Sequence, residues 1–195
     1  YSHVNGVPVF NQFDPKKVTV AHRLREAGYY TTMIGKWHLG SDPQGFDHWE
    51  VFPGQGVYFD PVLYTAEGSK KYVGGYATDV VTELAIRQLR ERPKDKPFFM
   101  MLHHKAPHRP WEPAARHKAI WSQKTIPEPP TLFDDYAGRT DALREQKQSI
   151  ARDLKKSDVK GDVPEGLTGE ARTRWKYQRY MQDYLGCIQG IDESV

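Results

Sequence analysis

Cysteine is nearly absent from this sequence of 195 residues, and long apolar runs are absent altogether. The single cysteine, Cys187, excludes an internal disulfide and the paired-cysteine knuckles that bind zinc. No apolar stretch approaches the roughly 18 residues that a membrane span needs, so no spanning segment is predicted. The net charge of +3, with acidic and basic residues interspersed, is too small to indicate a nucleic-acid partner.

Several catalytic motifs are missing as well. The sequence has no glycine-rich phosphate loop, no serine elbow and no His-Glu-x-x-His pair, which excludes the enzyme classes built on them. Cys187 lies on an apolar helical face, where a buried and inert thiol is expected. The acidic pairs at 134–135 and 192–193 are more typical of solvated charge than of a cation site. No metal ligands are therefore predicted in this chain.

The length is sufficient for one sizeable core or for a large piece of a bigger domain. The sequence begins at Tyr1 rather than at a methionine, and it stops at Val195 inside a predicted helix. We therefore expect a fragment or a processed chain.

Apolar spacing predicts helices over residues 14–27 and 76–92, followed by strands over 29–34 and 97–102. In the first helix Asp14 is the expected N-cap, and Gly28 is the expected stop. The continuous apolar run at 97–102 is typical of a parallel strand that is buried on both faces. This alternation of helix and strand predicts an α/β sheet.

The rest of the chain gives weaker signals. Residues 41–75 show little periodicity and predict a long, ordered surface excursion, and residues 140–156 form a highly charged helix candidate. Residues 156–169 resemble a linker, and a long helix is predicted from residue 170 to 195. The side chains expected to face a core from that helix are Trp175, Tyr184, Leu185, Ile188, Ile191 and Val195.

The most informative motif is GKWHLG at residues 35–40, directly after a predicted strand. If the strand geometry continues, Lys36 and His38 point to the same side and can bind one anion together. Histidine also titrates near neutral pH and can act as a general acid. The alternative is a lysine on a solvated turn beside a histidine that serves only in packing.

A second basic cluster, HHKAPHRP, occupies residues 103–110 after the other predicted parallel strand. It contains His104, Lys105, His108 and Arg109, and the prolines beside His108 restrict its backbone. Zinc ligation and plain loop polarity are the alternatives, although the spacing fits no zinc motif. Ligands in open α/β sheets bind beyond the carboxyl ends of the strands, so the two clusters together predict an anion site.

These segments resemble the type I sulfatases of the alkaline phosphatase-like superfamily. Residues 35–40 resemble the second family signature, and residues 97–110 resemble the later strand and its "PHxP" segment. Residues 1–7 resemble the segment directly after the first signature, and residues 184–192 resemble the helix before the C-terminal metal loop. The loop at 41–58 is most similar to bacterial N-acetylglucosamine-6-sulfatase-like enzymes.

The resemblance implies part of an alkaline phosphatase-like sandwich, with a mostly parallel central sheet flanked by helices. It implies that Lys36 and His38 bind the sulfate and that His108 is the general acid. His104, Lys105 and Arg109 carry over only as neighbours that contact substrate. It further implies Ca²⁺ and a formylglycine nucleophile, the latter expected upstream of Tyr1 and made by a formylglycine-generating or anaerobic maturation enzyme.

No position here matches the family's calcium ligands or its nucleophile. Residues 1–195 are therefore expected to form an incomplete catalytic domain, inactive as an isolated chain. The intact protein is expected to hydrolyse carbohydrate sulfates, such as sulfated amino sugars of glycosaminoglycans or mucins. The alternatives are a phosphodiesterase or phosphonate hydrolase of the same superfamily and a non-catalytic anion-binding fragment. The family implies a periplasmic or secreted location.

Overall fold

The computed structural model describes residues 13–195, and the chain divides into two compact units. The sheet unit comprises Tyr1–Ala106 with Ser194–Val195, and the helical unit comprises Pro107–Glu193. The family resemblance at residues 1–7 lies outside the described residues.

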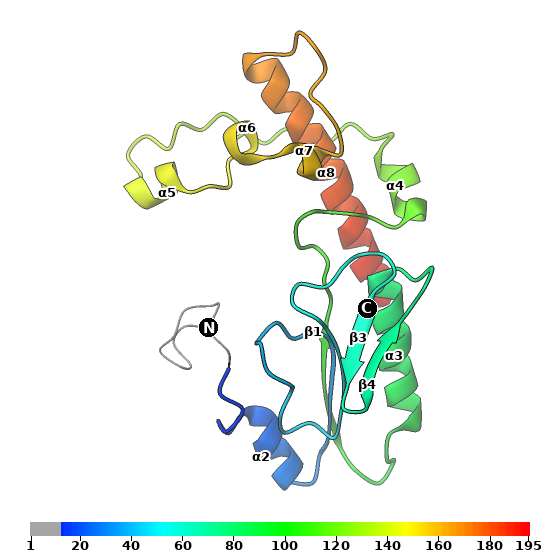
Figure 1. Cartoon of the computed structure of the whole chain (residues 1–195). Coiled ribbons are helices and arrows are strands. Elements are labelled where there is room, and N and C mark those ends of the chain that lie inside the picture. The colour runs from blue at the N-terminus through cyan, green and yellow to red at the C-terminus, as the bar shows by residue number, and fades with distance from the viewer. Residues whose placement is uncertain (1–12) are drawn as a thin grey trace. The chain divides into compact units, whose positions relative to one another are not determined.

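Five strands form the sheet of this unit, in the order β4-β3-β2-β1-β5. Figure 1 labels β1, β3 and β4 of this sheet and the helix α3. β1 (Tyr30–Lys36) lies between β2 (His48–Phe52) and β5 (Phe98–His103) and runs parallel to both. β3 (Val62–Thr65) and β4 (Gly68–Lys71) continue the sheet beyond β2 as antiparallel neighbours. The sheet is thus parallel around β1, and the predicted α/β class is confirmed.

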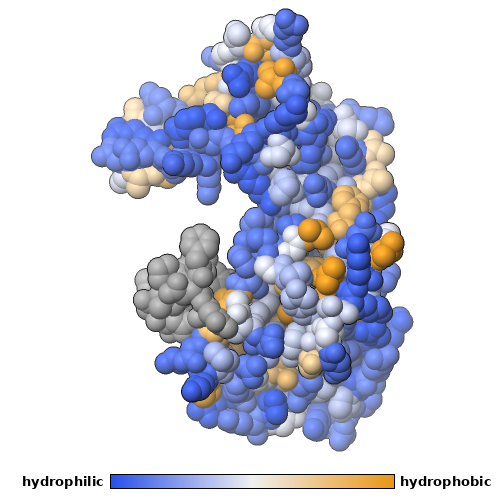
Figure 2. All heavy atoms as spheres, in the orientation of Figure 1, coloured by the Kyte–Doolittle hydropathy of each residue, from blue (hydrophilic) through white to orange (hydrophobic). Residues whose placement is uncertain are grey.

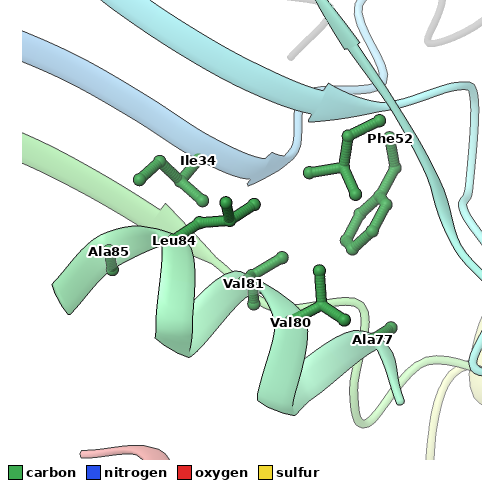
Figure 3. Close-up of a cluster of buried hydrophobic side chains, with 8 residues drawn as sticks. Ile34, Phe52, Ala77, Val80, Val81, Leu84 and Ala85 are labelled. Carbon is green, nitrogen blue, oxygen red and sulfur yellow. The ribbon is translucent and has the colours of Figure 1, made fainter. Parts of the chain in front are cut away.

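One face of the sheet is covered by α3 (Ala77–Glu91), which ends just before Pro93 as the sequence predicts. Val81 and Leu84 of this helix pack with Ile34 of β1 in a fully buried apolar cluster (Figure 3). Burial of such side chains supplies most of the driving force for folding.

The opposite face of the sheet packs against α2 (Val20–Glu26). Met33, the neighbour of Ile34 along β1, forms a second buried cluster with Val51 of β2 and Ala21 of α2. Successive residues of a strand face opposite sides of the sheet. The central strand is therefore buried on both faces, and the sheet is flanked by helices.

The helical unit contains the long helix α8 (Gly169–Ser194), which confirms the long helix predicted from residue 170. The other helices described in this unit are short. They are α4 (Ala115–Trp121), α5 (Asp141–Glu145), α6 (Ile150–Asp153) and α7 (Lys156–Val159).

The first helix begins later than the sequence predicts. Asp14 accepts a hydrogen bond from the backbone N–H of Lys16 at 2.9 Å and so stabilises a turn rather than a helix end. Thr19 is the actual N-cap, and its backbone N–H donates to Nδ1 of His22 at 3.2 Å. The Asp carboxylate accepts hydrogen bonds from nearby backbone N–H groups, and this property favours Asp both in turns and at helix N-caps.

The predicted surface excursion at residues 41–75 is wrong, because this region contributes β2, β3 and β4 to the sheet. Tyr58 and Leu63 are completely buried there. Strands of four or five residues contain too few positions for a clear alternation of polar and apolar side chains.

The expectation that the apolar run at 97–102 is buried on both faces is also wrong for the described chain. β5 is an edge strand of the described sheet, its residues are at most partly buried, and Phe98 is 44% exposed. The parallel direction of this strand is confirmed.

The charged segment 140–156 forms two short helices, α5 and α6, instead of one helix. The segment 156–169 is more than a linker, because its helix α7 buries Asp158 and Val159. Short polar stretches carry little periodic signal, so their structure depends on tertiary partners.

The sequence predicts the wrong core-facing side for α8, because none of the six side chains expected there is fully buried. Small and polar residues take their place against the neighbouring segments. A Cβ added to Gly186 would lie 2.8 Å from the Pro113 side chain, and Lys176 Nζ donates to the Ala151 carbonyl at 2.9 Å. The buried residues are Thr173, Lys176, Tyr177, Asp183, Gly186, Cys187 and Gly190.

Hydrophilic residues cover most of the face drawn in Figure 2, with apolar residues scattered among them. Within residues 13–195, no helix combines the length and the apolar character that crossing a membrane requires.

Candidate active site

The two basic loops predicted from the sequence begin at neighbouring strand ends. β1 and β5 are paired in parallel with Gly35 opposite His103, so both strands end at the same edge of the sheet. Nδ1 of His103 lies 3.2 Å from the carbonyl oxygen of Lys36, and since a carbonyl only accepts, Nδ1 carries the hydrogen. The expected convergence of the two strand ends is therefore observed within the sheet unit.

Gly35 allows these strand ends to approach closely. Its φ of +101° is left-handed, and an added Cβ would lie only 1.9 Å from the carbonyl oxygen of His103. Only glycine fits both restrictions. The close neighbour is thus the backbone of β5.

Lys36 is the last residue of β1, and its side chain is partly buried at this edge. Burial lowers the pKa of its ammonium group from the ordinary value. Among residues 13–195 no carboxylate forms an ion pair with it, and no hydrogen-bond acceptor contacts its Nζ. A partly desolvated cation without a neutralising acid is well suited to bind an oxyanion.

His38 does not continue the strand. β1 ends at Lys36, and His38 has a left-handed φ of +51°. The alternation rule behind the predicted same-side arrangement of Lys36 and His38 therefore does not apply. Trp37 orders the turn instead, because its Nε1–H donates to the Ser41 carbonyl at 2.7 Å.

His104 follows β5 and is held by hydroxyl groups. Its Nε2 lies 3.1 Å from Oγ of Ser194, and that hydroxyl lies 2.5 Å from Oγ1 of Thr82. Burial lowers the pKa of His104, and the charge of His103 lowers it further. His104 is therefore neutral near neutral pH and contributes dipoles rather than charge to this edge.

Lys105 is 6% exposed and points back into the sheet unit. Its Nζ donates to the Gln55 carbonyl at 3.2 Å and lies 4.9 Å from the centre of the Tyr58 ring. A cation over an aromatic face retains its charge at lower desolvation cost. Lys105 thus adds buried positive charge behind the loop.

His108 and Arg109 belong to the helical unit, where His108 is exposed. Nδ1 of His108 lies 2.5 Å from the Arg109 carbonyl oxygen. Because that oxygen only accepts, Nδ1 carries a hydrogen, and Nε2 is the nitrogen that can exchange a proton. The Arg109 guanidinium forms an ion pair with the buried carboxylate of Asp158.

The residues of the described chain do not form a metal site by themselves. No three His, Cys, Asp or Glu side chains among residues 13–195 gather as ligands would. The acidic pairs have other roles, since Asp134 pairs with Arg139 at 2.7 Å and Glu193 with Arg116 at 3.2 Å.

A family model described as Sulfatase matches residues 1–195, the whole chain. The chain belongs to the sulfatase family. The N-acetylglucosamine-6-O-sulfatase of Bacteroides thetaiotaomicron is 41% identical, over 100% of this chain and 43% of its own length. A sulfatase of Schizosaccharomyces pombe, described as uncharacterized, is 31% identical over 74% of this chain and 27% of its own length.

Among solved structures, BT4656 in complex with its substrate D-glucosamine-2-N,6-O-disulfate is similar, with a TM-score of 0.92 and 39% identity. The match covers 100% of this chain and 48% of that chain. The chain thus spans about half the length of these two sulfatases. Sulfatases of this family generally use Ca²⁺ and a formylglycine.

Sequence reasoning missed the residues that hold the basic side chains in place. Tyr58 lies under Lys105, Ser194 contacts His104, and Asp158 pairs with Arg109. These partners are 47, 90 and 49 residues distant in sequence, so no local pattern connects them. A charged residue such as Asp158 inside a linker-like stretch gives no signal that it is buried.

Proposed function

We propose that the protein hydrolyses sulfate esters of carbohydrates and that its substrates are 6-O-sulfated amino sugars of glycosaminoglycans or mucins. The observation that carries this proposal is the similarity over the whole chain to an N-acetylglucosamine-6-O-sulfatase and to BT4656 with its glucosamine disulfate. Both basic loops fall within the matched region.

In this proposal Lys36 and His38 bind the oxygens of the sulfuryl group. As the S–O bond breaks, negative charge develops on the leaving oxygen and is redistributed over the sulfuryl oxygens. A fixed cation that has no acid to neutralise it stabilises that charge without further reorganisation. The partial burial of Lys36 strengthens the effect, since electrostatic attraction is larger where water is excluded.

His108 is the proposed general acid. With Nδ1–H bonded to the Arg109 carbonyl, the imidazolium donates the proton on Nε2 to the sugar oxygen that leaves. The electron pair of the S–O bond passes to that oxygen and is neutralised by the proton. This role matters most for sugar alcohols, which are poor leaving groups.

His104 and Lys105 of the sheet unit and Arg109 of the helical unit are proposed as neighbours of the substrate. His104, neutral at neutral pH, offers hydrogen bonds, and Lys105 adds positive charge. The guanidinium of Arg109 forms an ion pair with Asp158, and the backbone carbonyl of Arg109 contacts His108.

Calcium and formylglycine belong to this proposal only as contributions from outside the described residues. The described carboxylates and histidines do not form a calcium site, and Cys187 is completely buried. The maturation enzyme that makes the formylglycine is likewise proposed from family membership.

The general-acid role is tested with His108→Ala in the full-length protein. We expect a kcat loss of roughly 10²- to 10⁴-fold on a 6-O-sulfated glucosamine. On an aryl sulfate, whose leaving group needs no proton, the loss is expected to be small. Steady-state rates on both substrates measure the difference. Equal losses on the two substrates would exclude the role.

The substrate class is tested with a sulfate and a phosphate ester of the same alcohol. We expect the sulfate ester to be hydrolysed faster, and a faster phosphate ester would instead favour a phosphodiesterase. Lys36→Ala is expected to lower the rate by roughly 10²- to 10³-fold. Lys71→Ala is the matched control, because it removes the same charge from the exposed strand β4.

A further inference from the structure

We propose that Asp158 is a positioning residue for His108 and that it acts through Arg109. The inference rests on the proposed general-acid role of His108. All three residues lie in the helical unit, and the sequence places Asp158 in a segment without any functional signal.

The first contact is a two-pronged ion pair. Nε of Arg109 donates to Oδ1 of Asp158 at 2.6 Å, and its NH2 group donates to Oδ2. The same NH2 group also donates to the Asp153 carbonyl at 3.1 Å. A planar guanidinium bound on two edges cannot rotate freely. The Arg109 side chain therefore has one orientation.

Asp158 is itself fixed. It is 2% exposed, and its Oδ2 accepts a hydrogen bond from the Lys155 backbone N–H at 2.7 Å. Burial raises the pKa of its carboxyl group, but the hydrogen bonds from Arg109 and Lys155 and the charges of Arg109 and Lys160 outweigh burial. The pKa is lowered, so Asp158 is ionised at neutral pH.

The second contact connects the ion pair to the imidazole. The Arg109 carbonyl, on the residue whose side chain Asp158 fixes, accepts the Nδ1–H hydrogen bond from His108 at 2.5 Å. This bond selects the tautomer and limits rotation of the ring. Serine hydrolases orient a histidine with a carboxylate in direct contact. Here the carboxylate orients the histidine through a neighbouring residue.

The ring of His108 is solvent-exposed, so its orientation depends on contacts such as the one between Nδ1 and the Arg109 carbonyl. Asp158, which binds the Arg109 side chain, is buried. Misplacement of a catalytic group by about 1 Å can cost a factor on the order of 10² in rate. The ion pair therefore affects the proton-transfer step rather than the binding of the sulfuryl group.

The test is Asp158→Asn in the full-length protein, assayed on both the sugar sulfate and the aryl sulfate. Asn keeps the shape but loses the charge that holds Arg109. We expect kcat on the sugar sulfate to fall roughly 10- to 100-fold with KM nearly unchanged. The rate on the aryl sulfate should change by less than about threefold, because its leaving group needs no proton. A purely structural role would lower both rates together.

Asp162→Asn is the matched control, because Asp162 forms an ion pair with Lys156 at the surface, 2.6 Å apart. It should change neither rate. In a His108→Ala background, Asp158→Asn should cause no further loss on the sugar sulfate. An additive loss there, or equal losses on both substrates, would overturn the proposal.

If Asp158→Asn does not fold, Asp158→Glu is the second variant. It keeps the charge, but its side chain is one methylene longer, so the two-pronged contact with Arg109 is lost and the same selective loss is expected. Unchanged kcat on the sugar sulfate would overturn the proposal. If His108→Ala itself shows no dependence on the leaving group, the proposed general acid is wrong. If His108→Ala shows that dependence and the Asp158 variants do not, the positioning role alone is wrong.

Discussion

At the scale of single residues, the site depends on one glycine as much as on its charged groups. Gly35 separates the buried part of β1 from Lys36 and lies against the backbone of His103. The left-handed φ and the lack of space for a Cβ are independent restrictions. Both must hold for the two strand ends to stay paired beside Lys36.

Gly35→Ala is expected to lower the free energy of unfolding by roughly 3 kcal/mol or more, from backbone strain and from displacement of β5. Gly54→Ala is the control, because Gly54 also has a positive φ of +51° but no atom within 4 Å of an added Cβ. It should cost about 1 kcal/mol from strain alone. Urea unfolding of both variants measures the difference, and equal costs would contradict the steric explanation.

At the scale of elements, a polar cluster joins β2 to α3. Glu50 is 3% exposed and accepts hydrogen bonds from Arg87 of α3 at 2.5 Å and from the Tyr72 hydroxyl at 3.2 Å. His48 Nε2 lies 3.1 Å from the same carboxylate. Burial, together with the charge of Glu50 and its hydrogen bond, raises the pKa of Tyr72 to about 12. The cluster thus holds a buried anion with several donors.

This cluster makes stability depend on pH. Burial raises the pKa of Glu50, but hydrogen bonds from His48 and Tyr72 and the charges of Arg87 and His48 lower it below the ordinary 4.5. A carboxyl with a lowered folded pKa contributes stability that is fully present above about pH 4.5. That contribution is lost as the pH falls through the folded value.

Glu50→Gln is expected to lower the free energy of unfolding by about 2 to 3 kcal/mol at neutral pH, because charged hydrogen bonds are lost. The difference from wild type should shrink as the pH falls below about 4.5. Chemical unfolding at several pH values measures it, with the exposed Glu67→Gln as control. A difference that grows toward low pH would contradict the lowered pKa.

At the scale of the whole molecule, the described residues include the basic side chains proposed to bind an oxyanion, and no three of their His, Cys, Asp or Glu side chains gather as metal ligands would. The only cysteine is completely buried in α8. The chain covers only part of the length of its sulfatase relatives, and about half of the length of BT4656.

The 195-residue chain by itself is expected to show no turnover of an aryl sulfate, even with added Ca²⁺. Circular dichroism would show whether the chain is folded under the assay conditions. Calcium-dependent turnover by the folded chain that is lost in Lys36→Ala would contradict this expectation. The full-length protein is the positive control.

The sequence by itself determined the elements with strong periodicity and the motifs beside them. Helix α3, strand β1 and helix α8 are long or regular enough for their spacing to identify them. The segments at residues 1–7, 35–40, 97–110 and 184–192 together indicated the sulfatase family, which the family model confirms. Such signals are local, so no knowledge of the fold is needed to read them.

Only the tertiary structure decided which side chains are buried and what holds the basic residues. β2 depends on pairing with β1, and β3 and β4 depend on pairing in turn beyond β2. The buried face of α8 depends on close contact with segments such as Pro113. Asp158 becomes a partner of Arg109 because folding brings residues 49 positions apart together. Contacts across such distances stabilise the protein through packing and desolvation, and neither is encoded in the spacing of nearby residues.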